Sequence, residues 1–362
     1  MVQAPLEHRG STVQVCGLWP FAVGTGTPMI GVPLGRSILN DATLCCDPIS
    51  WFQHAKLIHN PSCFYLGKPG LGKSSVLRRQ SLGLAGFGVL SMFLGDTKGE
   101  HVDLVQAQGG AVFRLGPNRD YINVVDVSDA RAAERRLREA GFTEQAEEVR
   151  ADADRRRLML VETLITISRK GREVTDRETA LIGEALAMLD AESDTPPVLP
   201  DLVRVIEARP EELRVIAMDR GDSARYQDVT ENLLVSLRSL TGRGRLGEIF
   251  SRQSTVKLPL DRSCVFDLSA VRGGDDSLLA AALVVCWAIG FGAVNIGQVL
   301  AECGLGPLRH WFVVLDELWR ALRAGAGMVD RVDELTRLNR QWGTGVAMCT
   351  HTMSDLDGLP NR

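Results

Sequence analysis

Three features are missing from this sequence, and each absence narrows the class of protein. There is no C-x-x-C pair and no histidine at a metal-binding spacing, although the chain has eight cysteines. Several of these cysteines lie inside apolar runs, so we expect a reducing, cytosolic compartment and no disulfide framework. Residues 1–10 contain Pro, Glu, His and Arg and do not form a signal peptide. The formal net charge is only −4, so the molecule as a whole gives no sign of nucleic-acid binding.

Charged residues are also absent from the stretch 277–301, and its length would permit a membrane span. Glycines, Asn295 and Gln298 dilute its second half, and strand-like apolar runs flank it at 264–268 and 311–315. A helix that is apolar on all sides also occurs in the core of large α/β domains. We therefore favour a buried crossover helix over a membrane span.

A glycine-rich loop is the strongest motif that the sequence does contain. The pattern G-x-x-x-x-G-K-S follows a short apolar run, which is the phosphate-binding P-loop pattern. Glycines allow backbone angles closed to other residues, so that successive N–H groups can point at an anion. The lysine would bring a charge to the phosphates, and the serine hydroxyl would bind Mg²⁺. The residues of this predicted ATP site are Gly67, Lys68, Pro69, Gly70, Leu71, Gly72, Lys73, Ser74 and Ser75.

The segment after the loop predicts a βαβ unit. A helix from Lys73 to about Ala85 is followed by a strand at 89–94, which implies a parallel sheet and an α/β fold. This strand ends in Gly95-Asp96-Thr97-Lys98-Gly99-Glu100. Polar residues at the carboxyl end of a parallel strand face the crevice where ligands bind. Asp96 and Glu100 could belong to the nucleotide site or to a solvated turn, and the sequence leaves both open.

The apolar run 311–315 ends in two adjacent carboxylates, Asp316 and Glu317. A P-loop NTPase needs one acidic residue in the Mg²⁺ shell and a neighbouring carboxylate for the attacking water. We assign Asp316 to the metal and Glu317 to the water, which favours an ATPase over a small-molecule kinase. A further strand at 346–352 ends in polar residues, and one of them, His351, would face the γ-phosphate and could sense its presence.

The middle of the chain has a different composition. Residues 129–222 are rich in Ala, Leu, Arg and Glu at helical spacing, which predicts a helical subdomain inserted between strands. Mixed charges between Arg131 and Arg157 favour a solvated helical face. An excess of basic residues between 238 and 262, including Arg243 and Arg245, could contact phosphates of a polymer, although a plain surface loop is the preferred interpretation. The predicted division is 1–35 as an N-terminal β-hairpin or extension, 36–128 and 223–362 as the two parts of the core, and 129–222 as the insertion.

Taken together, these motifs resemble the HerA/FtsK superfamily of ring-forming ATPases, and most closely the TraC-like transfer ATPases of conjugative type IV secretion. The resemblance covers about residue 31 to the C-terminus. The matching pieces are Val32-Pro33-Leu34-Gly35, Asn60-Pro61, the P-loop, Asp96-Thr97-Lys98-Gly99-Glu100, Gly109-Gly110, Ile122-Asn123, Asp316-Glu317-Leu318-Trp319 and Arg340-Gln341.

The resemblance implies a RecA-like core with a helical insertion and a hexameric ring. In such a ring an arginine enters the neighbour's site, a position that Arg340 matches, with Arg337 as the nearby alternative. The chain departs from the family in three ways. It has Thr350-His351 where Thr-Gln is usual, it nearly lacks the large domain ahead of the motor, and the last sheet strands are expected to be missing.

The function expected from the motifs and the resemblance is that of an ATP- and Mg²⁺-dependent motor for conjugative secretion or DNA transfer. It would act at the cytoplasmic face of the cell membrane, with secretion-channel membrane proteins and DNA or a protein–DNA substrate as partners. A DNA translocase of the same fold is one alternative. A nucleotide-gated scaffold that barely turns ATP over is another.

Overall fold

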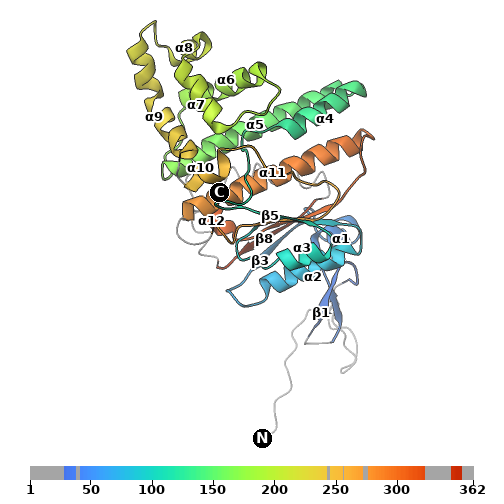
Figure 1. Ribbon diagram of the computed structural model, residues 1–362. Helices are drawn as coiled ribbons and strands as arrows, with labels where there is room; N and C mark the ends of the chain where they lie inside the picture. Colours follow the sequence, from blue (N-terminus) through green and yellow to red (C-terminus); the bar gives the residue numbers. More distant parts are fainter. Residues whose placement is uncertain are drawn as a thin grey trace, which may run out of the picture.

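A six-stranded sheet with strand order β3-β8-β7-β4-β6-β5 forms the centre of the computed structural model (Figure 1). All of its strand pairs are parallel, which confirms the predicted α/β fold. The structure describes residues 28–37, 41–242, 245–255, 257–271, 276–322 and 344–352. The strands are β3 Ser62–Leu66, β4 Leu90–Asp96, β5 Ala111–Arg114, β6 Cys264–Asp267, β7 Trp311–Leu315 and β8 Gly345–Thr350.

Helices cover both faces of this sheet, because its central strands are apolar on both sides. In β4, Met92 and Leu94 pack in one hydrophobic cluster and Phe93 packs in another. The cluster around Phe93 contains residues of α1, α2 and α3, which lie below the sheet in Figure 1. The other face is covered by α11. The bounds of these helices are α1 Pro48–Gln53, α2 Lys73–Ala85, α3 Val102–Ala107 and α11 Asp276–Glu302.

A short antiparallel hairpin precedes the sheet. It pairs β1 Pro33–Arg36 with β2 Thr43–Cys45. Asp47 joins this hairpin to the core, because its carboxylate accepts hydrogen bonds from the backbone N–H of Val32 and from that of Ser50 in the first turn of α1. Most of the predicted N-terminal hairpin region, residues 1–27, lies outside the described residues, and the hairpin seen here crosses the boundary predicted at residue 35.

The long apolar stretch forms the core helix α11. It is the one helix in the described parts of the chain that is long and apolar enough to cross a membrane, and 78% of its most apolar window is buried inside the protein. The indole Nε1 of Trp287 donates a hydrogen bond to the carbonyl oxygen of Leu94 in β4 at 2.7 Å. The buried-helix interpretation of this stretch is therefore confirmed.

Gly290 shows how closely α11 approaches β4. A Cβ atom at this position would lie 2.6 Å from both Leu94 Cδ atoms and 3.0 Å from Met92 Sδ, and both side chains are fully buried. Alanine favours helix over glycine by up to about 1 kcal/mol. We nevertheless expect Gly290→Ala to lower the free energy of unfolding by about 1–3 kcal/mol, because the added methyl overpacks the core.

Gly183 provides the matched control, since it lies in helix α6 (Asp176–Glu192) and a Cβ atom there would have no neighbour within 4 Å. Gly183→Ala is expected to raise stability by up to about 1 kcal/mol. Urea unfolding of the two variants measures both effects, and a stabilising Gly290→Ala would contradict the close packing of α11 on β4.

Seven helices lie beyond α11 on the same side of the sheet, at the top of Figure 1. They are α4 Ser128–Glu139, α5 Thr143–Ser168, α6 Asp176–Glu192, α7 Leu199–Ala208, α8 Glu211–Ala217, α9 Ser223–Thr241 and α10 Arg245–Phe250. The helices continue past residue 222, the predicted end of the insertion, as the helical pattern over 229–240 also indicates.

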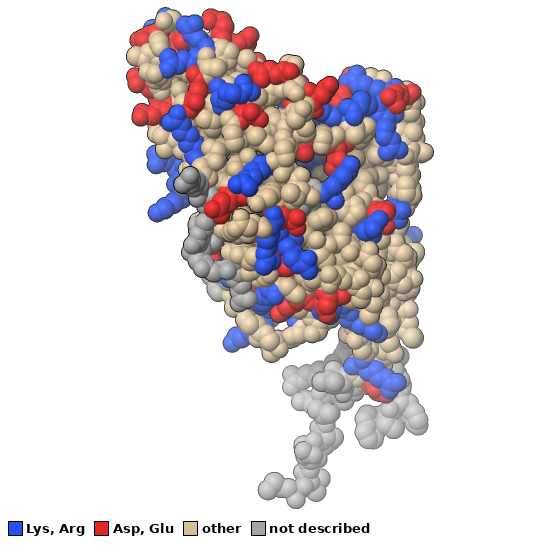
Figure 2. Space-filling view, viewed as in Figure 1, with Lys and Arg blue, Asp and Glu red and all other residues tan. Residues whose placement is uncertain are grey.

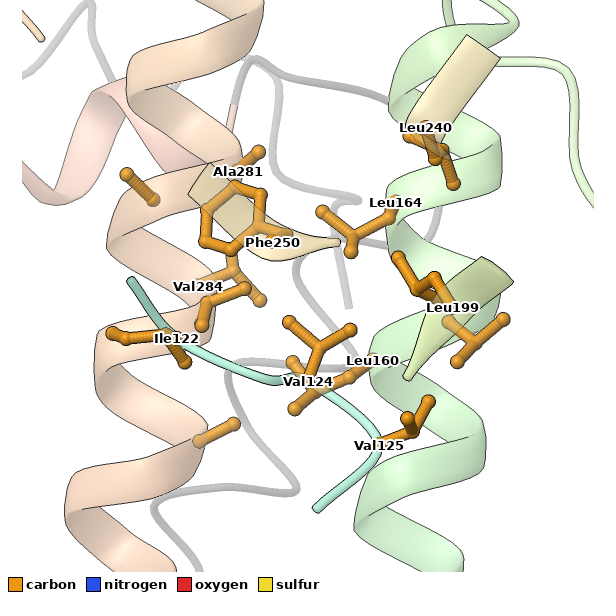
Figure 3. Packing of buried hydrophobic residues seen from close by; sticks show 14 of the residues in the cluster. Ile122, Val124, Val125, Leu160, Leu164, Leu199, Leu240, Phe250, Ala281 and Val284 are labelled. Carbon is orange, nitrogen blue, oxygen red and sulfur yellow. The ribbon is translucent and has the colours of Figure 1, made fainter. Parts of the chain in front are cut away.

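This helical block shares one hydrophobic core with the upper face of the sheet. Figure 3 shows the segment containing Ile122 and Val124 running between two helices, with Leu160 and Leu164 of α5 on one side and Val284 of α11 on the other. The block is therefore packed on the sheet through α11 and has no separate core of its own at this junction.

The mixed charges between Arg131 and Arg157 form a solvated face only in part. Arg135, Glu144 and Glu148 are exposed, as predicted, whereas three of the arginines are held in ion pairs inside the helical block. The guanidinium groups of Arg131, Arg150 and Arg157 all bind the carboxylate of Asp190. The side chains of Arg157 and Asp190 are only 5% and 10% exposed. These ion pairs tie α4, α5 and α6 together, and charge pattern alone could not indicate this because Asp190 lies on a different helix.

Candidate functional site

The glycine-rich loop lies between β3 and α2, in the predicted strand–loop–helix order. Gly70 and Gly72 have φ angles of +82° and +87°, and nothing lies within 4 Å of a Cβ at either position. Glycine is therefore needed at both positions for the backbone conformation and not for lack of space. Gly67 is different, since its φ is not positive and its Cβ would meet Lys73 Cγ at an ordinary 3.6 Å. The prediction that all three glycines adopt such angles is wrong at Gly67.

Lys73 is the first residue of α2, where backbone N–H groups have no partner within the helix. Its ammonium group donates to the carbonyl oxygen of Gly67 and lies 3.0 Å from Nδ1 of His351. The lysine thus folds back over its own loop and faces the end of β8. This places a positive charge beside a row of N–H donors, as an anion site requires.

Parallel register brings three strand ends to this loop. Leu66 at the end of β3 pairs with Thr350 of β8, and Leu315 at the end of β7 pairs with Met348. His351 and Asp316 follow directly after these strands. They lie with the loop around a cleft of about 560 Å³. Its lining residues are Pro69, Gly70, Gly72, Lys73, Ser74, Ser75, Arg78, Lys98, Gly99, Glu100, Asp103, Asp316, Glu317 and His351.

The carboxyl group of Asp316 has a raised pKa in the cleft. Burial, followed by the negative charge of Glu317, raises the pKa of Asp316 to about 6. Two adjacent carboxylates in a buried place favour a bound cation. Among the described residues, no group of three or more His, Cys, Asp or Glu side chains forms a metal cage. Mg²⁺ fits such a site, because it is usually held by one or two protein carboxylates together with phosphate oxygens and water.

Glu317 is buried, with 5% of its surface exposed, and has the unusual φ of +54°. A non-glycine residue in this region costs about 1–3 kcal/mol and occurs preferentially at functional sites. Its Oε2 accepts a hydrogen bond from the indole Nε1 of Trp319 at 2.6 Å and lies 3.2 Å from Nε2 of His351. The sequence identified Glu317 but gave no indication of either partner.

His351 connects the lysine to the glutamate. An ammonium group can only donate, so Nδ1 of His351 must accept from Lys73. The neutral imidazole then carries its proton on Nε2, where it can donate to Glu317. His351 therefore lies between the loop and the end of β7, and its contacts assign the ring proton to Nε2.

Asp96 and Glu100, the two acidic residues at the end of β4 and in the loop after it, have different roles. Asp96 is 2% exposed, and its carboxylate accepts hydrogen bonds from the backbone N–H groups of Lys98, Glu100 and His101. It therefore shapes the loop. Glu100 lines the cleft, and a hydrogen bond with the Ser74 side chain lowers the pKa of Glu100. Sequence reasoning missed Lys98, which also lines the cleft and whose position in the loop after a parallel strand was the available signal.

Several predicted residues lie outside the described parts of the chain or have other roles. Arg337, Arg340 and Arg243 are not among the described residues. The basic residues of the segment 238–262 that are described mostly face acidic or aromatic partners. Arg238 binds Glu207, Lys257 lies near Asp129, Arg262 binds Asp261, and Arg252 lies 5.1 Å from the Tyr121 ring centroid. Figure 2 also shows basic and acidic side chains intermingled on the face in view.

Comparison with known proteins gives structural matches only. No protein-family model and no curated protein sequence matches the chain. VirB4 of Thermoanaerobacter pseudethanolicus matches with a TM-score of 0.65 and 16% identity, over 92% of this chain and 80% of that one. The unbound bacterial conjugative coupling protein TrwB has a TM-score of 0.46 and 14% identity, over 90% of this chain and 67% of that one. Plasmid coupling protein TrwB with ADP and Mg²⁺ also has a TM-score of 0.46 and 14% identity, over 82% of this chain and 65% of that one. The chain therefore has the RecA-like P-loop fold that VirB4 shares.

Proposed function

We propose that this protein binds and hydrolyses ATP with Mg²⁺ and acts as a motor for conjugative, type IV-like secretion or DNA transfer. The observation that carries the proposal is the convergence of Lys73 and Ser74, at the start of α2, with Asp316 and Glu317, at the end of β7, on one cleft. The fold shared with VirB4 supports the secretion context.

The chain's own residues divide the work of binding. The backbone N–H groups of residues 70–75 and the Lys73 ammonium group would hold the phosphates. The Ser74 hydroxyl and the Asp316 carboxylate would bind Mg²⁺, and the Ser74 oxygen can do so while its proton is donated to Glu100. When bound, Mg²⁺ neutralises charge on the phosphate oxygens.

Glu317 is the group that favours hydrolysis over binding alone. Its carboxylate lies in the cleft beside Asp316 and can accept a proton from a water that attacks the terminal phosphate. Lys73 can move to the developing charge on the phosphate, since its present partners are uncharged carbonyl oxygens and an imidazole nitrogen, which a phosphate oxygen can replace. His351 would then report the presence of the phosphate, because it contacts both Lys73 and Glu317.

The assembly remains part of the proposal. We infer a hexameric ring at the cytoplasmic face of the membrane, recruited by channel proteins, with Arg340 completing the neighbour's site. DNA or a protein–DNA complex would be the transported substrate. Turnover per subunit should then rise with protein concentration as rings form. Turnover independent of concentration would contradict a shared site.

Replacing Lys73 with Ala tests the site directly. Loss of a charge-assisted contact of about 1.5–3 kcal/mol should weaken ATP binding roughly 10- to 100-fold and remove measurable hydrolysis at ordinary ATP concentrations. Binding is measured with a fluorescent ATP analogue and hydrolysis by phosphate release.

The control is Lys257→Ala, because the Lys257 side chain is 85% exposed and its pairing with Asp129 at 3.8 Å is a surface contact. It should bind and hydrolyse ATP like the unaltered protein. Wild-type affinity in Lys73→Ala would refute the site. ATP binding without any turnover in the unaltered protein would favour the nucleotide-gated scaffold.

A further inference from the structure

We propose that Trp319 is a positioning residue that holds Glu317 by one carboxylate oxygen and thereby aims the other at the attacking water. The inference rests on the proposed ATP hydrolysis. It starts from the hydrogen bond between the indole Nε1 of Trp319 and Oε2 of Glu317, which is 2.6 Å long. Hydrogen bonds to an ionised acceptor are shorter and stronger than neutral ones.

Trp319 Nε1 donates to Oε2 of Glu317, and two further nitrogen atoms lie near the same oxygen, of which Arg320 Nε makes no hydrogen bond within the described parts of the chain. Trp319 Nε1 lies 2.6 Å from Oε2, His351 Nε2 lies 3.2 Å from it, and Arg320 Nε lies 3.9 Å from it. Oε1 takes none of these contacts. Because Glu317 lines the cleft, Oε1 is the oxygen that can accept the proton of a water held there.

The backbone explains why the carboxylate needs such a holder. Glu317 sits between the end of β7 and the start of α12 Leu318–Leu322, with a φ of +54°. A residue at this turn has no helix or strand to fix its side chain. A carboxylate within a near-attack geometry must be held by the groups around it, since small displacements reduce the rate strongly.

Trp319 is itself held in place. The Arg320 guanidinium lies 4.5 Å from the centroid of its ring, and Arg320 binds Asp276 at the start of α11 with an N–O distance of 2.7 Å. The His351 ring centroid is 6.4 Å from that of Trp319. The indole therefore connects the water-activating group to the core helix that carries the helical block.

Trp319→Phe removes the N–H donor and keeps an aromatic ring beside Arg320. We expect kcat to fall about 10-fold or more, as for loss of a hydrogen bond to a charged group, while the Kd for ATP changes less than about twofold. An unchanged kcat would overturn the inference. So would a Kd that weakens as much as kcat falls, because a general structural role would affect both.

A second measurement needs no turnover and no nucleotide. The indole N–H resonance of Trp319, identified in ¹⁵N-labelled protein by its absence in Trp319→Phe, should shift in Glu317→Gln because the acceptor loses its charge. Trp51 and Trp287 are internal controls, since their indoles donate to the carbonyl oxygens of Ile30 and Leu94. A Trp319 signal that stays in place would overturn the inference.

The two variants also separate this inference from the proposed function. If Glu317→Gln hydrolyses ATP at the normal rate, the proposed hydrolytic site is wrong. If Glu317→Gln is inactive while Trp319→Phe retains full kcat, only the positioning role is wrong. In the Glu317→Gln background, Trp319→Phe should cause little further loss, because Trp319 acts through the glutamate.

Discussion

Replacing Glu317 with Gln is expected to lower kcat about 10²–10⁴-fold while ATP binding persists. The amide cannot accept the proton of the attacking water, yet it has nearly the shape of the carboxylate. The amide oxygen can still accept the hydrogen bond from the Trp319 indole Nε1, which in the unaltered protein lies 2.6 Å from Oε2 of Glu317. The loop and Lys73, which bind the phosphates in the proposed site, are unchanged by the substitution.

Single-turnover phosphate release and titration with a fluorescent ATP analogue measure the two quantities separately. Glu302→Gln is the matched control, because Glu302 is an exposed glutamate at the end of α11 that accepts only from Gln298 among the described residues. It should leave kcat and Kd unchanged. Glu317→Gln with normal turnover would mean that another group activates the water, and Glu100, which also lines the cleft, would be the first to examine.

The sequence predicted those parts of the site that are local in the chain. The loop with Lys73 and Ser74 follows a strand and begins a helix, so its geometry depends on neighbours that are close in the sequence. Asp316 and Glu317 directly follow a buried apolar strand. Side chains at the carboxyl ends of parallel strands meet at one edge, which was enough to place both carboxylates beside the loop.

The contacts between these parts could not be predicted, because they depend on strand order. Lys73 and His351 are 278 positions apart, and they meet only because β8 lies between β3 and β7. The hydrogen bond from Trp319 to Glu317 spans two residues but requires the φ of +54° at Glu317, which no composition pattern indicates. Gly67 is a case in which the motif suggested more than the structure shows, since the φ of this glycine is not positive.

The same reasoning applies to the helical block. Helical periodicity located its helices, but the convergence of Arg131, Arg150 and Arg157 on Asp190 depends on how α4, α5 and α6 pack. The sequence predicted a helical subdomain inserted between strands, and it gave no indication that one core cluster runs from these helices through α11 into the sheet. The assignment of domain boundaries therefore stays a prediction.

Replacing Trp287 with Ala is expected to lower the free energy of unfolding by about 3–5 kcal/mol. Trp287 is fully buried in α11, and its indole donates to the carbonyl oxygen of Leu94 in β4 at 2.7 Å. Truncation leaves a cavity between the helix and the sheet. Trp287→Phe should cost less, about 1–3 kcal/mol, because it fills most of the space but leaves the Leu94 carbonyl without this donor.

Urea unfolding followed by circular dichroism measures these losses, with Trp51→Ala as the control. Trp51 is only partly buried in α1 and donates to Ile30, so its truncation should cost clearly less than that of Trp287. Equal costs would contradict a central role for α11 in the core. The comparison also distinguishes the two interpretations of the uncharged stretch, a membrane span and a buried core helix. A membrane-spanning helix does not need a hydrogen bond from an indole N–H to the carbonyl oxygen of a strand. The helix α11 joins the sheet to the helical block, and this contact holds it above β4. Because β4 ends in Asp96, the same contact supports the strand that leads to the cleft.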